Sequence, residues 1–146
     1  MVYRSVVVEE YLFETILALP SVTTTFADRI VTNRNEDDEG TEFPFLEIIR
    51  LPRSSTARPL VSGGPIIAEQ FIYDISGWDE SHTTDTILQA MNDIDNVLLN
   101  ENEVFKDGFL IVVDQVEELP PAEPPRSGED PIVRLGKAWS VAALGA

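Results

Sequence analysis

The stretch from Phe43 to Leu99 constrains the fold more than any other part of the chain. Its first segment, FPFLEIIRL (Phe43–Leu51), is partly apolar on both faces and carries Pro44 near its start, where a missing N–H group is tolerated, so it predicts a strand. A second segment, IIAEQFIYDISGW (Ile66–Trp78), alternates apolar and polar side chains and predicts a longer strand. Because a single loop joins the two, we expect an antiparallel β-hairpin.

An amphipathic helix is predicted directly after the second strand. Asp79 or Ser81 is suited to cap its N-terminus, because a short polar side chain there accepts a hydrogen bond from a free backbone N–H group. The polar residues of the segment fall on the opposite side of the helix. Six apolar residues recur at three- and four-residue spacing and form the expected buried stripe: Ile87, Leu88, Met91, Ile94, Val97 and Leu98.

The loop between the two strands, Pro52 to Pro65, is the cationic part of an acidic chain. Its prolines and paired glycines oppose regular structure over most of its length. No Asp or Glu lies between Glu47 and Glu69, whereas Arg50, Arg53 and Arg58 all do. These arginines are either a solvated hairpin tip or a surface that contacts the carboxylates of another copy or another protein.

The remaining segments predict one more helix and three more strands. The helix begins with Ser5 as N-cap and ends before Pro20, and the two long strands that close the chain are separated by a proline-rich acidic segment. Predicted elements and loops are a short weak strand at Phe26–Asn33, strands at Phe109–Val116 and Ile132–Leu144, a polar connection at Asn100–Lys106, and extended loops at about 33–42, 52–65 and 117–131.

Together these elements predict an α+β fold. We expect a mainly antiparallel β-sheet with two helices packed against it and long hairpin loops, in a single domain spanning residues 1–146. A chain of this length can bury enough surface for one core without disulfides or metals.

Composition excludes several classes of site. The chain has no Cys and one His, His82, so neither a Cys-based zinc site nor a His-rich metal site can form. The acidic loop NRNEDDEGTE (Asn33–Glu42) lacks the ligand spacing of a calcium-binding hand. We find no nucleophile, phosphate-binding or metal-helix motif, so we expect no catalytic, cofactor-binding or metal-binding residue and no enzymatic activity, although a carboxylate pair among so many acids is invisible to sequence.

The charge balance also limits the partners. Ten Lys and Arg against 26 Asp and Glu give a net charge of −16, which opposes binding to a nucleic-acid duplex through its phosphates. An acidic surface keeps a protein soluble, and it would equally suit the wall of a passage that DNA crosses without sticking. No apolar run is long enough for a membrane-spanning helix, and the N-terminus lacks the features of a signal peptide.

The order of the elements resembles the tail terminator or tail completion proteins of long-tailed bacteriophages, also called head–tail joining proteins. In that family an N-terminal helix precedes an aromatic-Pro-aromatic strand, a strand that ends in an aromatic residue, and a helix that organises one side of the sheet. Here the corresponding segments are Phe43-Pro44-Phe45, EQFIYDISGW ending at Trp78, and TTDTILQAMNDIDNVL. The likeness covers residues 5 to 116 and is one of residue types.

The resemblance implies a structural protein of the virion, located in the neck or tail of the particle and in the host cytoplasm during assembly. It implies a homo-oligomer, commonly a hexameric ring, that caps the tail tube and joins it to the head-side connector. DNA would pass through the lumen of this ring without specific binding, and no membrane is expected as a partner. The basic segment with Arg50, Arg53 and Arg58 is then a candidate contact between subunits or with the tube.

Two other readings stay open at this level. The first alternative is another neck, connector or minor tail protein. The second is a non-viral interaction module whose proline-rich segment ELPPAEPP (Glu118–Pro125) is bound by a partner in an extended form.

Overall fold

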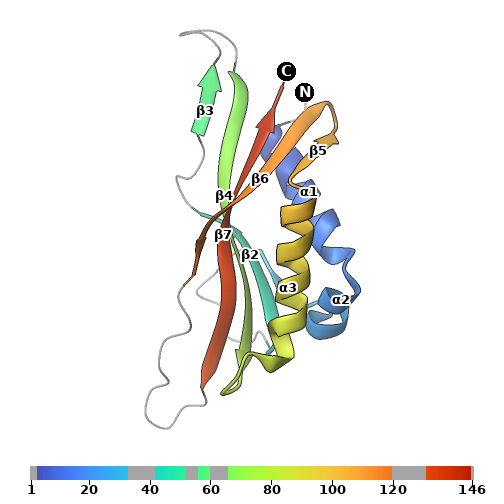
Figure 1. Ribbon diagram of the computed structural model, residues 1–146, viewed down its shortest axis with the longest axis vertical. Helices are drawn as coiled ribbons and strands as arrows, with labels where there is room; N and C mark the ends of the chain where they lie inside the picture. The colour runs from blue at the N-terminus through green and yellow to red at the C-terminus, as the bar shows by residue number, and fades with distance from the viewer. Residues whose placement is uncertain (1–2, 33–41, 52–55, 60–65, 120–130, 146) are drawn as a thin grey trace.

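The computed structural model describes residues 3–32, 42–51, 56–59, 66–119 and 131–145, with the backbone alone at 56–59, 66 and 67. One seven-stranded sheet carries all three described helices on one face, which we call the helix face; the other we call the second face (Figure 1). The α+β prediction is confirmed. The prediction of two helices is wrong, because a third, short helix follows the first.

The elements have the following bounds. The helices are α1 (Arg4–Leu17), α2 (Pro20–Phe26) and α3 (Asp85–Asn100). The strands are β1 (Ile30–Val31), β2 (Phe45–Arg50), β3 (Thr56–Pro59), β4 (Ile66–Glu80), β5 (Glu103–Lys106), β6 (Phe109–Glu118) and β7 (Ile132–Leu144).

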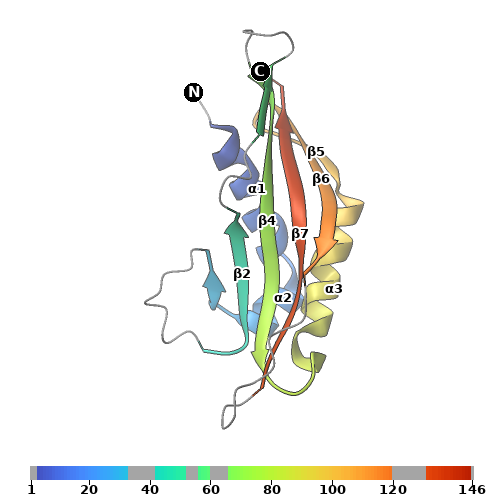
Figure 2. The same ribbon diagram turned by 90° about the vertical axis from the view of Figure 1, so that its left-hand side faces the viewer.

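The strand order is β1-β2-β4-β7-β6-β5, with β3 pairing with β4 beside β2. The predicted hairpin is present: β2 and β4 are antiparallel, and Phe45 lies opposite Trp78. The spine of the sheet is the antiparallel pair β4–β7, in which every residue from Ile132 to Leu144 has a partner. β1 and β2 form the one parallel pair among the described strands. Figure 2 shows β2 and β6 on opposite sides of this spine.

The core lies between the sheet and the helices. Alternate residues of β4, β6 and β7 point to the helix face, as the period of two requires, and one stripe of each long helix meets them. Leu88 of the predicted α3 stripe is exposed, and Ala90 takes its place. The largest fully buried side chains are Trp139, Tyr73, Phe26, Phe71, Leu12, Ile16, Leu46, Ile75, Ile87, Ile94, Leu98 and Ile111.

The weak strand predicted at Phe26–Asn33 is largely wrong. Pro20 opens helix α2, where proline is tolerated in the first turn. Val22 and Phe26, four residues apart, share one face of this helix and are both fully buried in the core. Only Ile30 and Val31 form a strand.

The predicted caps are also wrong. α1 begins at Arg4 with Tyr3 as N-cap, so Ser5 lies inside the helix. Asp79 belongs to β4, which continues to Glu80, and α3 begins after its N-cap Thr84. Neither Tyr3 nor Thr84 makes a side-chain capping hydrogen bond. Tertiary packing, rather than capping, therefore sets where these helices begin.

Two short strands were missed. β5 lies in the predicted polar connection and pairs with β6 through a tight turn at Asp107 and Gly108, whose φ angles are 50° and 87°. Asp-Gly is the signal for such a turn, because both positions need positive φ. β3 interrupts the predicted loop at 52–65. The predicted loops at 33–42 and 117–131 lie mostly outside the described residues.

Candidate interaction site

The structure places two of the three candidate arginines in strands. Arg50 is the last residue of β2, opposite Tyr73, and its side chain is exposed. Arg58 lies in β3, opposite Ala68 of β4, and its side chain is outside the description. Arg53 lies outside the described residues. Part of the basic segment therefore lies in strands β2 and β3, which both pair with β4, and the segment is not entirely a loop.

Arg50 lies on the helix face, at the edge of the core. Its guanidinium carbon is 5.6 Å from the centroid of the Phe71 ring, a cation–π distance. Its ladder partner Tyr73 is buried. Burial of the phenol and, to a lesser degree, the Glu9 carboxylate raise the pKa of Tyr73 to about 12, while the Arg50 guanidinium acts in the opposite direction. Arg50 is therefore held over an apolar ring with its charge accessible.

This environment predicts a loss of stability at high pH. In the unfolded chain the tyrosine ionises near pH 10, whereas in the folded chain its pKa is about 12. The unfolded state therefore releases its proton first, and the free energy of unfolding should fall between pH 10 and 12 by roughly 2–3 kcal/mol. Urea titrations across this window should show a smaller fall in Tyr73→Phe. An identical fall in the variant would contradict the assignment, and exposed Tyr3→Phe is the control.

The second face of the sheet carries a polar cluster of Asp74, Ser76 and Arg134. Arg134 Nη2 donates to Asp74 Oδ2 at 2.6 Å, and Arg134 Nε donates to Ser76 Oγ at 3.1 Å. Ser76 Oγ in turn donates to Asp74 Oδ1 at 2.6 Å. Each charge has a partner of opposite charge or a polar neighbour, so the cluster is a satisfied structural network.

Gly136 makes this cluster sterically feasible. It lies opposite Ser76 in the β4–β7 ladder, and a Cβ atom there would be 2.1 Å from Ser76 Oγ. Beside the cluster, the Arg134 guanidinium carbon is 5.0 Å from the centroid of the Trp78 ring, which stacks on Phe45 at a centroid distance of 6.2 Å. Phe43 continues the group at 5.3 Å from Phe45. Both motif segments, Phe43-Pro44-Phe45 and the end of β4, thus meet in one aromatic cluster.

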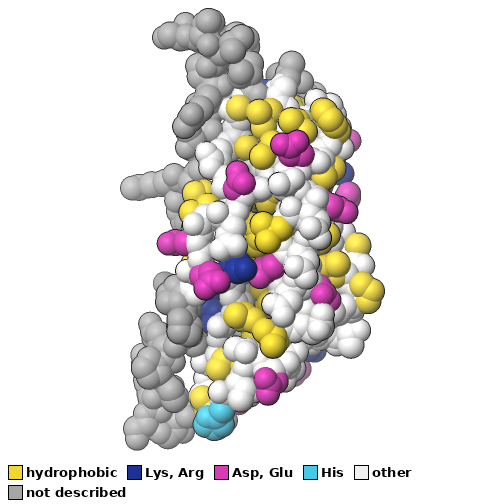
Figure 3. Space-filling view, viewed as in Figure 1, with side chains coloured by type: hydrophobic (Ala, Val, Ile, Leu, Met, Phe, Trp, Pro, Cys, Tyr) yellow, Lys and Arg dark blue, Asp and Glu magenta, His cyan; other side chains and the backbone are white. Residues whose placement is uncertain are grey.

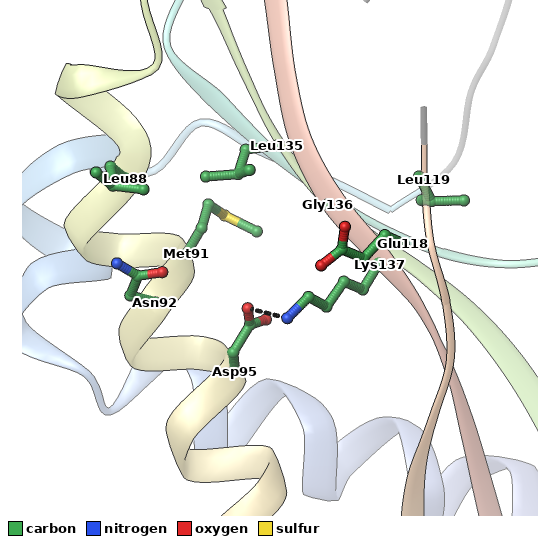
Figure 4. A pocket seen from close by; sticks show the side chains of 9 residues that line it. All are labelled: Leu88, Met91, Asn92, Asp95, Glu118, Leu119, Leu135, Gly136 and Lys137. Carbon is green, nitrogen blue, oxygen red and sulfur yellow. Dashed lines mark hydrogen bonds and ion pairs between the residues drawn. The ribbon is translucent and has the colours of Figure 1, made fainter. Parts of the chain in front are cut away.

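A small pocket lies between α3 and the end of β6 (Figure 4). Its volume is about 170 Å³, and the Lys137 Nζ–Asp95 Oδ2 ion pair, 2.7 Å long, crosses its wall. Leu88, Met91 and Leu135 form an apolar wall, and Glu118 lines the opposite side. Since its charged groups are already paired or exposed, the pocket gives no indication of a specific ligand.

One end of the molecule exposes apolar side chains. Arg4 Nη2 donates to the Gly145 carbonyl, which brings the two chain ends together there (Figure 1). In the same region Phe105 is 81% exposed and Tyr3 is 70% exposed, and Val6 and Leu144 are also exposed. Figure 3 shows hydrophobic side chains gathered near this end and acidic side chains distributed along the rest of the visible face. We call this region the apolar end.

Within the described part of the chain, no three His, Asp or Glu side chains are placed to hold a metal ion. None of the three described helices combines the length and apolarity that crossing a membrane requires. The acidic loop considered for calcium, Asn33–Glu42, lies outside the described residues except for Glu42.

No protein-family model matches this sequence, and no curated protein is similar to it. Among solved structures, the chain is similar to the bacteriophage SPP1 gp17 protein. The two chains are 14% identical with a TM-score of 0.48, and the likeness covers 97% of this chain and 91% of gp17.

Proposed function

We propose that this chain is a structural protein of a bacteriophage virion that forms a ring at the end of the tail tube and joins it to the head-side connector. The observation that carries the proposal is the aromatic cluster. Phe43-Pro44-Phe45 enters β2, Trp78 ends the facing part of β4, and the two stack while α3 covers the helix face. The resemblance to tail terminator proteins implies this order of segments, with a helix on one side of the sheet.

The charge and surface of the molecule are consistent with such a role. A net charge of −16 disfavours adhesion of DNA, and a passage for the genome must not bind the DNA that crosses it. The apolar end provides exposed Tyr3 and Phe105, the residue types that bury well at protein–protein contacts. We assign the tube contact to this end, because a ring that caps a tube needs one surface perpendicular to its axis.

The direct test is the assembly state of the full chain. Mass photometry and negative-stain electron microscopy should detect closed rings, of which six copies is the expected number, either with the protein alone or with tubes assembled from the tail tube protein of the same phage. In the second case the rings should cap tube ends. A protein that stays monomeric and does not bind tubes at any concentration would refute the proposal.

The basic segment supplies a second prediction. Arg53→Glu and Arg58→Glu, tested separately, should each weaken ring or tube assembly at least tenfold and reduce its dependence on salt, because each replaces an attractive charge with a repulsive one. Thr86→Glu combined with Asn96→Glu adds the same net charge on the exposed side of α3 and is the control. Assembly that is indifferent to both arginine changes, or equally weakened by the control, would rule out the contact.

A further inference from the structure

At each of the two edges of the sheet, part of a strand has no described strand beside it. On one side, β1 pairs with β2 only at Leu46 and Glu47, so Ile48–Arg50 extends beyond it. On the other side, β5 pairs with β6 only at Phe109–Val112. The Val113 N–H donates to the Asn102 carbonyl, and Asp114–Glu118 then continues without a described partner on its outer side. Such edges are templates for pairing with another strand.

These two edges lie at the same level of the sheet. The ladders β2–β4, β4–β7 and β6–β7 connect residues in straight rows from one edge to the other. Three rows link the edges: Ile48, Ile75, Lys137 and Glu118; Ile49, Asp74, Ala138 and Glu117; and Arg50, Tyr73, Trp139 and Gln115. A neighbouring copy placed at the same height would therefore bring its β2 edge against this β6 edge.

The two edges are also complementary in charge. The β6 edge carries Asp114, Glu117 and Glu118, all exposed and without an ion pair among the described residues. The β2 edge ends in exposed Arg50, next to the basic segment that contains no acid. Glu118 and Arg50 both share rows with residues on the helix face, so their side chains would lie on the same side of a joined sheet.

Strand direction is compatible with closure. β2 runs opposite to β4, β4 opposite to β7, and β7 opposite to β6, so β6 runs opposite to β2. In a ring whose axis runs along the strands, every copy points the same way, and β6 of one copy would meet β2 of the next in antiparallel orientation. The contact is heterologous, since two different surfaces meet, and heterologous contacts generate rings when the rotation closes.

We propose that the β6 edge at Asp114–Glu118 of one copy pairs, antiparallel, with the β2 edge at Ile48–Arg50 of the next, so that the sheet continues from subunit to subunit. This rests on the ring of the proposed function and specifies its interface. The partner is a second copy of this chain, because both complementary edges belong to the same molecule and occupy the same rows. Closing the sheet would also pair two edges that no described strand occupies, and unpaired edges favour aggregation.

Cysteine crosslinking of the full chain tests the interface, since the natural sequence has no Cys. Two double variants are made: Arg50→Cys with Gln115→Cys, and Arg50→Cys with Glu118→Cys, the second allowing for a shifted register. Within one chain the Arg50 and Gln115 positions are three strand spacings apart, about 14 Å, which exceeds the roughly 7 Å limit between the Cα atoms of a disulfide. Any disulfide between them must therefore join two copies.

On mild oxidation, at least one double variant should give a ladder of covalent dimers, trimers and larger species on a non-reducing gel. Its yield should be at least tenfold above that of the control pair Arg50→Cys with Glu103→Cys, because Glu103 is exposed on β5 outside the rows. Each single-cysteine variant should stop at the dimer, since it offers only one thiol per chain.

The outcomes separate the interface from the function. Rings seen in the reduced wild-type protein without a ladder in either variant would overturn the edge pairing and leave the ring function standing. Ladders equal to those of the control pair would likewise overturn it, as they would reflect unspecific oxidation. Neither rings nor ladders, alone or with tubes, would overturn both proposals.

Discussion

Replacing Trp139 with Ala should lower the free energy of unfolding by about 4 kcal/mol. The side chain is fully buried at the centre of the β4–β7 spine, opposite Tyr73 on one side and Gln115 on the other. Truncation removes the largest apolar surface of the core and leaves a cavity that the rigid ladder around it cannot close. Urea denaturation followed by circular dichroism measures the change.

Two variants calibrate this result. Phe105→Ala removes an aromatic ring that is 81% exposed, and it should change the free energy of unfolding by about 0.5 kcal/mol or less. Trp139→Phe keeps most of the buried volume and should fall between the two. If Trp139→Ala were no more destabilising than Phe105→Ala, the placement of the core on the helix face would be wrong.

Arg134→Met should lower the free energy of unfolding by about 3 kcal/mol, because it leaves the Asp74 carboxylate without the guanidinium that compensates its charge. The two side chains are only 16% and 13% exposed, so water replaces the lost partner poorly. Ser76 Oγ would also lose the donor Arg134 Nε. The same urea titration measures the effect.

The double variant Arg134→Met with Asp74→Leu separates the cost of a broken pair from that of a missing side chain. It should recover most of the lost stability, since replacing both charges with apolar groups of similar size is often neutral. Lys106→Met, which breaks the ion pair with exposed Glu14, should have a much smaller effect than Arg134→Met. A double variant less stable than Arg134→Met alone would contradict this explanation.

The sequence was sufficient for the long elements, and the reason is periodicity. Ile66–Trp78 and Ile132–Leu144 carry side-chain alternation over many residues, so they are present as β4 and β7, with β4 two residues longer than predicted. The α3 stripe was predictable for the same reason, apart from exposed Leu88. Short elements lack this averaging: α2 was hidden by its β-branched residues.

The candidate site was less accessible to sequence reasoning. The basic segment was visible from charge alone, but its proposed counterpart on β6 was not, because three separate ladders must be known before Arg50 and Gln115 fall in one row. The Asp74–Arg134 pair was hidden for a similar reason, since sixty residues separate its members. The Asp-Gly turn before β6, in contrast, is a local signal in the sequence.

The β4–β7 spine has a mechanical consequence. It runs along the longest axis of the molecule, and all 13 residues of β7 pair with β4 (Figure 1). A force parallel to these two strands would load all of the hydrogen bonds between them at once. A force perpendicular to the strands would break the hydrogen bonds one after another. The chain should therefore withstand far larger forces along this axis than across it, and single-molecule pulling in the two directions would measure that anisotropy.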